Sequence, residues 1–479
     1  MKRLYLLLVF LTNLCFSQDQ LTYRLDRFSG VNGVIVDPTH SLVNDNHWDA
    51  NIISVGTFLQ NNYVYLNNSS VITAMQSDGF YTQENTPAYN PDKNYIQMGF
   101  NRNQNFYENL QVEIQGPSFA WRQKIKERDY AIGAFSRARS MVSGMNMDQS
   151  FGYDAIKTQL PSAILAPEYT VKASKINMAN WAEIGLNLAT RINENPFEQW
   201  LFGTNLKFLL GYDAAMLNIP KSFEVSVSDQ DFLMKNYQVD AMATTAYNFD
   251  TQTYDWKKNN GLGGSIDIGI SFVKNKYKTY RDQEFEYDDK FSAALLDLGF
   301  ISFKGENHTY RLNAQSLINF DTFQQNTNSL QDFFAQLSQT IYGNPDRSRV
   351  SDSFKIGMPT SLMLNFDSNF YKNHHLNFSF FQRIPVFENS LRRPNIFSVS
   401  YSIQKNALSY GVSTSLYEYQ SLRFGGYLRL GPLFLGSENI LPIFFKHQKL
   451  QSFDFYIGLK LFPFWDNLLK KRQRQKCNC

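Results

Sequence analysis

The segment Ser452–Phe462 reads SFDFYIGLKLF, with an apolar side chain at every second position. The apolar parity runs from Phe453 to Leu461, and the other parity holds Asp454, Gly458 and Lys460. A β-strand points successive side chains to opposite faces, so this pattern predicts a strand with one apolar face. Segments of this kind recur along nearly the whole chain, and this repetition constrains the fold more than any single motif.

The same alternation is found in other parts of the chain. Trp181–Ile192 and Trp200–Gly211 flank a turn-like stretch and are predicted to form a hairpin. Gly264–Val273 repeats the pattern, and Leu296–Phe300 is predicted to place Leu296, Leu298 and Phe300 on its apolar face. In the last third of the chain, further short alternating runs are joined by tight polar turns. We count about fourteen such segments in total.

Two fold classes can accommodate a single strand of this kind, a soluble β-sandwich and a membrane barrel. About fourteen amphipathic strands in a soluble fold would need a matching apolar layer to cover them, whereas a barrel turns its apolar face to lipid. The repetition therefore favours the all-β class, a transmembrane antiparallel β-barrel of about 14 strands with a short N-terminal plug segment.

The composition agrees with a barrel. Aromatic residues make up 15% of the 479 residues, with 41 Phe and 27 Tyr, which suits the aromatic girdles of a membrane barrel. The mean hydropathy is only −0.37, as expected when apolar residues occupy every second position. The net charge of +3 gives no reason to expect a nucleic-acid partner.

The N-terminus has the three parts of a secretory signal: Lys2-Arg3, an apolar run, and small residues ending at Ser17. We therefore predict four segments. They are a cleaved signal peptide (1–17), an N-terminal plug (18–47), an outer-membrane barrel (48–465) and a basic periplasmic tail (466–479) that ends in Cys477 and Cys479.

Two internal stretches interrupt the alternation. Met141–Met178 is rich in Ser, Met and Pro and is predicted to be a long extracellular loop. Ser329–Gly343 carries apolar residues at helical spacing, which predicts a short amphipathic helix packed on a loop or in the lumen.

No catalytic or metal-binding motif is found, so the chain is not predicted to be an enzyme and needs no cofactor and no metal. Charged residues do fall on the polar parity of the predicted strands, where they would face the lumen. Their mixed signs favour cross-bracing inside the barrel over an ion-selective pore. These residues are Glu183, Arg191, Lys207, Asp267, Asp297, Arg423, Arg429, Asp454 and Lys460.

Four short motifs carry a family resemblance: Gly30–Thr39, Trp48–Ile52, Asn61–Tyr63 and Gly431–Ser437. Together they resemble a family of uncharacterised Bacteroidota outer-membrane barrels, which is distantly similar to the FadL-like transporters of hydrophobic compounds. In FadL-like proteins an Asn-Pro-Ala turn belongs to the N-terminal plug. Asp37-Pro38-Thr39 stands at that place here and departs from the turn at two of three positions.

The resemblance implies an outer-membrane protein that acts as a passive channel or transporter for small hydrophobic compounds. The candidate plug residues are Asn32, Gly33, Asp37 and Pro38. The alternative is a scaffold barrel that transports nothing and binds another envelope protein, for example as a secretion or gliding accessory. The expected partners are thus outer-membrane lipid and either a small hydrophobic ligand or an envelope protein.

Overall fold

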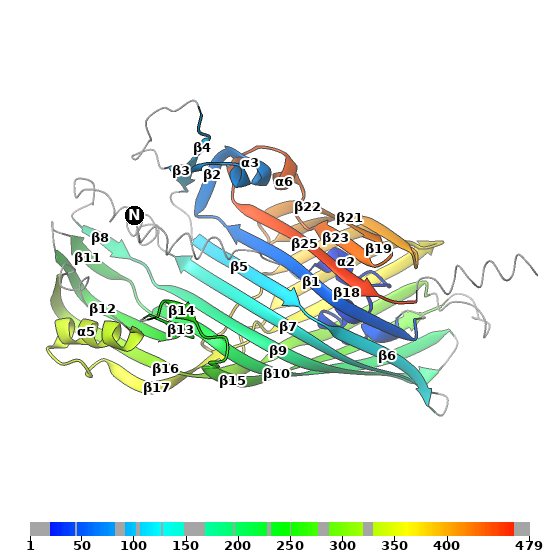
Figure 1. Cartoon of the computed structure of the whole chain (residues 1–479), viewed down its shortest axis with the longest axis horizontal. Helices are drawn as coiled ribbons and strands as arrows, with labels where there is room; N and C mark the ends of the chain where they lie inside the picture. The colour runs from blue at the N-terminus through cyan, green and yellow to red at the C-terminus, as the bar shows by residue number, and fades with distance from the viewer. Residues whose placement is uncertain are drawn as a thin grey trace, which may run out of the picture.

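Hydrogen-bonded strands close into a ring in the computed structural model of the chain (Figure 1). The predicted signal peptide and the predicted basic tail, with Cys477 and Cys479, lie outside the residues that the structure describes. The described residues are 20–43, 46–81, 92–101, 106–125, 128–147, 168–194, 197–227, 231–249, 251–275, 287–319 and 329–463.

The wall of the ring is one antiparallel sheet of 19 strand segments, whose ends close because the first segment pairs with the last. The segments are β1 (Trp48–Asn61), β5 (Phe106–Gln115), β6 (Ser118–Ile125), β7 (Arg128–Met147), β8 (Glu168–Val171), β9 (Ser174–Glu194), β10 (Glu198–Ile219), β11 (Phe223–Val227), β12 (Asp231–Thr244), β15 (Gly261–Lys274), β16 (Asp289–Asn319), β17 (Arg349–Gly357), β18 (Ser361–Tyr371), β19 (His374–Arg383), β20 (Ile396–Gln404), β21 (Leu408–Tyr417), β22 (Ser421–Leu430), β23 (Leu433–Ser437) and β25 (Ser452–Leu461).

Five positions in the ring are each built from two consecutive segments: β5/β6, β8/β9, β10/β11, β12/β15 and β17/β18. The 19 segments therefore form a closed barrel of 14 strands. The predicted fold class and strand number are confirmed.

The two ends of the barrel differ in their connections. At the end where β1 begins and β25 finishes, turns of two or three residues join β18 to β19, β20 to β21 and β22 to β23. At the opposite end, residues 62–105 connect β1 to β5, and residues 320–348 connect β16 to β17. We call these the short-turn end and the long-loop end.

The wall is also much taller on one side. β9, β10 and β16 contain 21, 22 and 31 residues, whereas β19, β20, β21 and β22 contain 9 or 10. In Figure 1 the long strands extend to the left, where β8, β11, β12 and β17 project past the rest of the wall. The barrel therefore has an oblique long-loop end.

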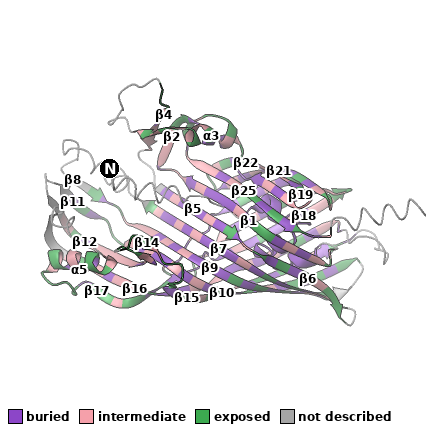
Figure 2. Cartoon of the chain, viewed as in Figure 1, coloured by how far each residue is buried: buried purple, intermediate pink, exposed green. Residues whose placement is uncertain are grey.

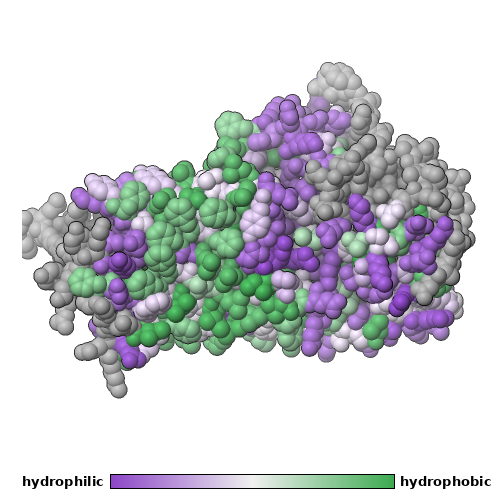
Figure 3. Space-filling view, turned by 180° about the vertical axis from the view of Figure 1, so that it is seen from behind, coloured by the Kyte–Doolittle hydropathy of each residue, from purple (hydrophilic) through white to green (hydrophobic). Residues whose placement is uncertain are grey.

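Side chains alternate between the interior and the outer surface along each strand, as the banding in Figure 2 shows. On β9, Ile184, Leu186 and Leu188 are exposed on the outside, whereas Glu183 and Asn187 are buried inside. β9 pairs with β10 over almost its whole length, so the predicted hairpin is confirmed. Outward apolar side chains of this kind form a band around the short-turn half of the barrel, green in Figure 3, which we call the apolar belt.

A small lobe sits at the rim of the low side of the wall, at the top of Figure 1. Its separate sheet has the strand order β24-β2-β4-β3. We call it the rim lobe. Its elements are β2 (Val64–Ser69), α3 (Val71–Met75), β3 (Gly79–Tyr81), β4 (Tyr95–Phe100), α6 (Leu441–Phe444) and β24 (His447–Leu450).

The predicted amphipathic helix is confirmed as α5 (Leu330–Tyr342). The Ser329 side chain caps its N-terminus by accepting a hydrogen bond from the Asp332 backbone N–H, and Gly343 ends it with φ 69°. α5 packs on β16 through Phe334. No helix in the described part of the chain is long and apolar enough to cross a membrane.

The prediction of a loop over Met141–Met178 is wrong at both ends. β7 continues to Met147, β9 begins at Ser174, and the two strands remain paired from Tyr130 to Met145. These strand ends lie past the apolar belt, where neither face meets lipid. The residues there need no apolar alternation, and that alternation was the only strand signal available in the sequence.

Candidate functional site: the filled lumen

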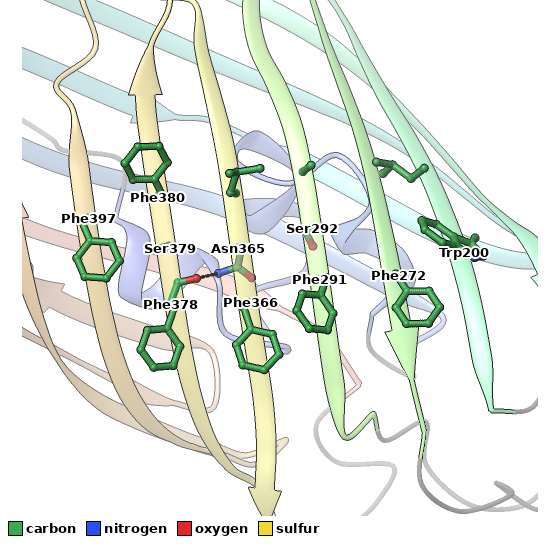
Figure 4. Close-up of a pocket in the computed structure, with 13 residues that line it drawn as sticks. Trp200, Phe272, Phe291, Ser292, Asn365, Phe366, Phe378, Ser379, Phe380 and Phe397 are labelled. Atoms are coloured by element: carbon green, nitrogen blue, oxygen red, sulfur yellow. Dashed lines mark hydrogen bonds between the residues drawn. The ribbon is translucent and has the colours of Figure 1, made fainter.

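The N-terminal segment, residues 20–43, lies inside the barrel, and every one of these residues is buried. We call it the plug segment. It consists of three short helices, α2 (Leu21–Arg24), η1 (Gly30–Ile35) and η2 (His40–Leu42). Figure 4 shows part of it behind the wall strands.

The backbone of the plug segment is a self-contained unit. The backbone-to-backbone hydrogen bonds described for it run between its own residues, from Arg24 N–H to Gln20 O at one end to Val43 N–H to His40 O at the other. Its bonds to the wall involve wall side chains instead. Lys460 Nζ donates to Phe28 O, and Asn205 Nδ2 donates to Val34 O. Displacement of the segment would therefore break contacts with wall side chains but none of the strand pairings described for the barrel.

The predicted plug residues Asp37 and Pro38 form the contact of the segment with β9, β10, β15 and β16. Asp37 Oδ2 accepts hydrogen bonds from Lys290 Nζ at 2.8 Å and from Ser292 Oγ at 3.0 Å. Pro38 O accepts one from Asn187 Nδ2 at 2.9 Å. Asp37 also accepts from Thr39 N–H, which fixes the local turn.

Close packing makes glycine necessary on both sides of this contact. A Cβ atom at Gly203 on β10 would lie 2.3 Å from Pro38 O. Within the segment, a Cβ atom at Gly33 would lie 2.3 Å from the His40 ring. The fourth predicted residue, Asn32, is buried and donates to the Tyr23 hydroxyl, so it stabilises the segment internally.

A second contact joins the plug segment to the first and last strands. Asp49 on β1 accepts a hydrogen bond from Val31 N–H at 2.9 Å and forms an ion pair with Lys460 on β25 at 2.5 Å. Gly30, next to Val31, has φ +61°, and a Cβ atom there would lie 2.1 Å from the Asp49 carboxyl. Only glycine combines this conformation with so close an approach.

On its long-loop side, the plug segment meets a continuous set of buried ion pairs, which we call the charge layer. Arg24 of the plug segment and Arg137 both pair with Glu113, and Arg137 also pairs with Glu183. Next to them, Lys207 bridges Asp267 and Asp297 at 2.6 and 2.5 Å.

Asp297 is the most highly connected member of the layer. Besides Lys207, it accepts hydrogen bonds from Arg139 at 3.1 Å and from Arg393 at 3.0 Å. The acidic members lie on β5, β9, β15 and β16, and the basic members lie on β7 and β10, in the plug segment and in the connection between β19 and β20. Such buried pairs hold the wall and the segment in one arrangement, because each charge has lost its water.

Asp297 reaches the interior through a β-bulge, which corrects one sequence prediction. The register between β15 and β16 shifts between Ile266 and Ile268, and Asp297 has φ 55°. As a result Leu296, predicted to lie on the outer apolar face, is fully buried beside Asp297. The bulge adds one residue to β16 and reverses the parity at this point.

The nine predicted lumen charges are all buried, but the structure does not bring them into one cluster. Glu183, Lys207, Asp267 and Asp297 belong to the charge layer. The others lie elsewhere on the inner wall. Arg191 pairs with Asp129, and Lys460 pairs with Asp49. Arg423 lies over the Tyr417 ring, Arg429 donates hydrogen bonds to the carbonyls of Lys405 and Asn406, and Asp454 accepts one from Glu438 N–H.

Sequence reasoning missed several members of the layer, namely Arg24, Glu113, Arg137, Arg139 and Arg393. Arg137 and Arg139 are two apart in an alternating run, so parity could have identified them. Arg393 lies in a connection without any alternation, and its role depends on the fold alone.

The inner wall turns apolar immediately past the charge layer. Along β7, Met141 follows Arg139; along β9, Trp181 lies two residues from Glu183; along β10, Leu209 follows Lys207. Together with Ile301 and Phe303 on β16, these residues belong to one buried apolar cluster. A packed apolar layer therefore lies on the long-loop side of the charges.

A groove of about 500 Å³ indents the outer wall across β10, β15, β16, β18, β19 and β20 (Figure 4). The small side chain of Ala293 lies among larger ones, and aromatic rings surround it. Trp200 and Phe272 have ring centroids 4.9 Å apart, and Phe291 and Phe366 are 4.5 Å apart. This wall groove can accept an apolar group from the lipid side.

One hydrogen-bonded trio resembles the connectivity of a catalytic triad. Ser348 Oγ lies 2.8 Å from His308 Nδ1, and His308 Nε2 lies 2.9 Å from Glu306 Oε2. Both Ser348 and His308 are only 2% exposed, and the His308 ring stacks on Phe334. A substrate has no access to this serine, so the trio ties β16 to the connection that follows α5.

The plug segment contains a titratable group that gives a first prediction. Burial and the nearby Lys290 ammonium lower the pKa of His40 from 6.5 to about 4. Burial alone would raise the pKa of Asp37, but Lys290 holds it at about 2. A displaced segment binds a proton at His40 below pH 6.5, whereas the docked segment does not until pH 4. Docking is therefore expected to weaken by roughly 3 kcal/mol as the pH falls from 6.5 to 4.

This loss is measurable as faster hydrogen exchange of the plug amides, corrected for the intrinsic exchange rate at each pH. His40→Gln is the control, because it removes the titrating group and should remove the part of the pH dependence that His40 causes, while the carboxyl groups of Asp49 and Glu438 that contact the segment are present in both proteins. Equal pH dependence in both proteins would contradict the assignment to His40.

The fold and the plug segment in the lumen together place this chain in the class of transmembrane β-barrels that hold an N-terminal segment inside the lumen. More particularly, the chain belongs to the family of unknown function DUF5723, whose model matches residues 42–438. The predicted membership of an uncharacterised barrel family is thereby confirmed. Among curated proteins, none matches the sequence.

This chain is also distantly similar to solved structures of other barrels. The CymD monoaromatic hydrocarbon channel is 10% identical, with 90% of this chain and 92% of that chain covered and a TM-score of 0.30. A Pseudomonas aeruginosa FadL homologue is 7% identical, with 90% and 93% covered and a TM-score of 0.22. The Serratia marcescens hemophore receptor HasR is 6% identical, with 87% and 80% covered and a TM-score of 0.20. Scores this low carry no information about what this chain binds.

Proposed function

We propose that the protein is an outer-membrane barrel that provides a gated passage for small apolar compounds, with the plug segment as its gate. The observation that carries this proposal is the self-contained backbone of the plug segment, which fills the lumen without joining the sheet. A segment built only to complete the wall would gain stability from strand pairing. This one is held by side chains, which can release it.

The location follows from the asymmetry of the barrel. Outer-membrane barrels have short periplasmic turns, longer extracellular loops and an apolar outer band. The short-turn end, where β1 begins and β25 finishes, corresponds to the periplasmic side, and the long-loop end corresponds to the outside. The signal peptide predicted at residues 1–17 is consistent with export to this membrane.

The class of compound is inferred from the residues that line the lumen and the wall groove. The charge layer holds five basic and four acidic side chains that pair with one another, so its charges nearly cancel and it offers little net field for selecting ions of one sign. The packed layer beyond it, with Trp181, Ile301 and Phe303, is apolar, and so is the wall groove. Small apolar molecules are favoured at both places because they leave water there.

A disulfide that can be formed and reduced tests whether the plug segment acts as a gate. Thr39 Oγ1 and Ser271 Oγ are 2.6 Å apart, so cysteines at both positions can form a disulfide between the plug segment and β15. Cys477 and Cys479 are first replaced by serine. In proteoliposomes, uptake of a small apolar tracer is expected to be low in the oxidised protein and to recover on reduction. The Ser271→Cys single variant is the control and should not respond to reduction.

Equal uptake in the oxidised and reduced states would exclude a gate formed by the plug segment.

The second candidate function is a scaffold barrel that binds another envelope protein. It is favoured by the tall side of the wall, because β9, β10 and β16 extend well past the apolar belt and a simple passage does not need them. A stably bound second chain in native mass spectra, together with absent uptake in both states, would select the scaffold.

A further inference from the structure

We propose that the rim lobe rests on the outer leaflet of the membrane, with Ile440, Phe444 and Phe445 inserted at the lipid interface. This inference rests on the proposed outer-membrane location, and it concerns a part of the chain that the lumen and its gate do not involve. It makes α6 a second membrane contact besides the barrel wall.

The apolar side chains around α6 are unusually exposed. Phe444 is 61% exposed, Phe445 is 63% exposed and Ile440 is 37% exposed. Two adjacent phenyl rings facing water would be costly, since each could bury a large apolar surface. A contiguous exposed apolar patch marks a surface that is covered in the working molecule.

This patch is continuous with the apolar belt, and the continuity indicates which surroundings cover the patch. The Ile440 N–H donates a hydrogen bond to Phe424 O at 2.8 Å, so the chain still follows β22 as it enters α6. Phe424 and Leu422 on β22 are themselves exposed members of the belt. α6 also contacts β25. The lipid that covers the belt is therefore the nearest apolar phase for the patch.

The two sides of the rim lobe differ in polarity. In Figure 3 the side of the lobe that adjoins the belt is green, whereas the side that faces away from it is purple. Because the lobe projects outward from the low side of the wall in Figure 1, its green side overhangs the membrane surface. A lobe made to bind a protein from outside would present its apolar side away from the membrane.

Two exposed lysine side chains come directly after the apolar patch in the sequence. Lys446 and Lys449 are exposed, and Lys449 is oriented by a hydrogen bond to Asn101 at 2.6 Å and by the Tyr65 ring, 4.7 Å away. Phenyl groups at the level of the acyl chains with ammonium groups beside them match an interface of apolar tails and phosphate headgroups. We therefore assign the occupant as the outer-leaflet lipid surface around the barrel, with its acyl chains and phosphate groups.

Depth-dependent quenching tests this placement. With Cys477 and Cys479 replaced by serine, Phe445→Cys carries an environment-sensitive nitrobenzoxadiazole label. The protein is reconstituted into phosphatidylcholine and phosphatidylglycerol vesicles that contain brominated acyl chains. Leu422→Cys, in the belt and 63% exposed, is the lipid reference, and Val350→Cys, on β17 and 61% exposed, is the water reference. A heat shift on a denaturing gel verifies that each variant forms a barrel.

The label at position 445 is expected to lose fluorescence to nearly the same extent as the label at 422, while the label at 350 stays unquenched. If 445 behaves like 350 while 422 is quenched, the lobe does not touch lipid and this inference is wrong, although the membrane barrel stands. If 422 is also unquenched, the membrane location itself is wrong.

Discussion

Replacing Gly203 with valine is expected to open the lumen without changing any charge. The new Cβ would meet Pro38 O at 2.3 Å, and this contact is with backbone that cannot rotate aside. Overpacking of this kind costs about 1 to 3 kcal/mol. If the cost falls on the docked state of the plug segment, the ratio of open to closed barrels rises by roughly 5- to 150-fold. Single-channel recording in planar bilayers measures this as more frequent openings.

Gly264→Val is the matched control for this experiment. Gly264 lies on the neighbouring strand β15 and is exposed on the outside, and a Cβ atom there meets only Lys207 O, at 3.6 Å. The control should behave like the unmodified protein. If Gly203→Val folds to a heat-modifiable barrel and also shows unchanged openings, displacement of Pro38 and Thr39 does not open a passage.

Asp297→Asn is expected to destabilise the whole barrel. The change keeps the shape of the side chain but removes the charge that Lys207, Arg139 and Arg393 share. Removing one partner from a buried ion pair costs about 3 to 5 kcal/mol, because the opposite charge is left uncompensated. The expected result is a lower urea midpoint for loss of the heat-modifiable form, with the number of barrel strands unchanged.

A surface pair provides the comparison for this variant. Asp352 pairs with Arg349 at 2.8 Å, and its side chain is 78% exposed. Solvent-exposed pairs contribute about 1 kcal/mol or less, so Asp352→Asn should shift the midpoint little. A similar shift in both variants would mean that the charge layer does not hold the barrel together.

Much of the wall could be predicted from the sequence because lipid imposes a strict rule on each strand. Ile184, Leu186 and Leu188 had to share a face, and Glu183 had to lie opposite them. The rule applies only to the lipid-facing part of a strand. The sequence therefore predicts a loop over Met141–Met178, although β7 and β9 extend into its two ends. Bulges are also hidden from a strict alternation, as Leu296 shows.

The candidate site was only partly predictable, because it depends on contacts between distant parts of the chain. Asp37 could be suspected from its motif, but its partner Lys290 is 253 residues away. Glu113 and Arg137 pair only because of the register of β5 and β7. The exposed phenyl groups of α6 gave no sequence signal, since a short apolar run looks the same whether it is buried or not.

The contact at Asp49 has a consequence for how the closure of the ring and the docking of the plug segment are linked. Asp49 on the first strand, Lys460 on the last strand and Val31 of the plug segment meet at the seam where the ring closes. The segment precedes β1 in the chain, and its neighbours at the seam come from both ends of the wall. One carboxylate, that of Asp49, therefore takes part both in the pairing of the first strand with the last and in the docking of the segment that precedes β1.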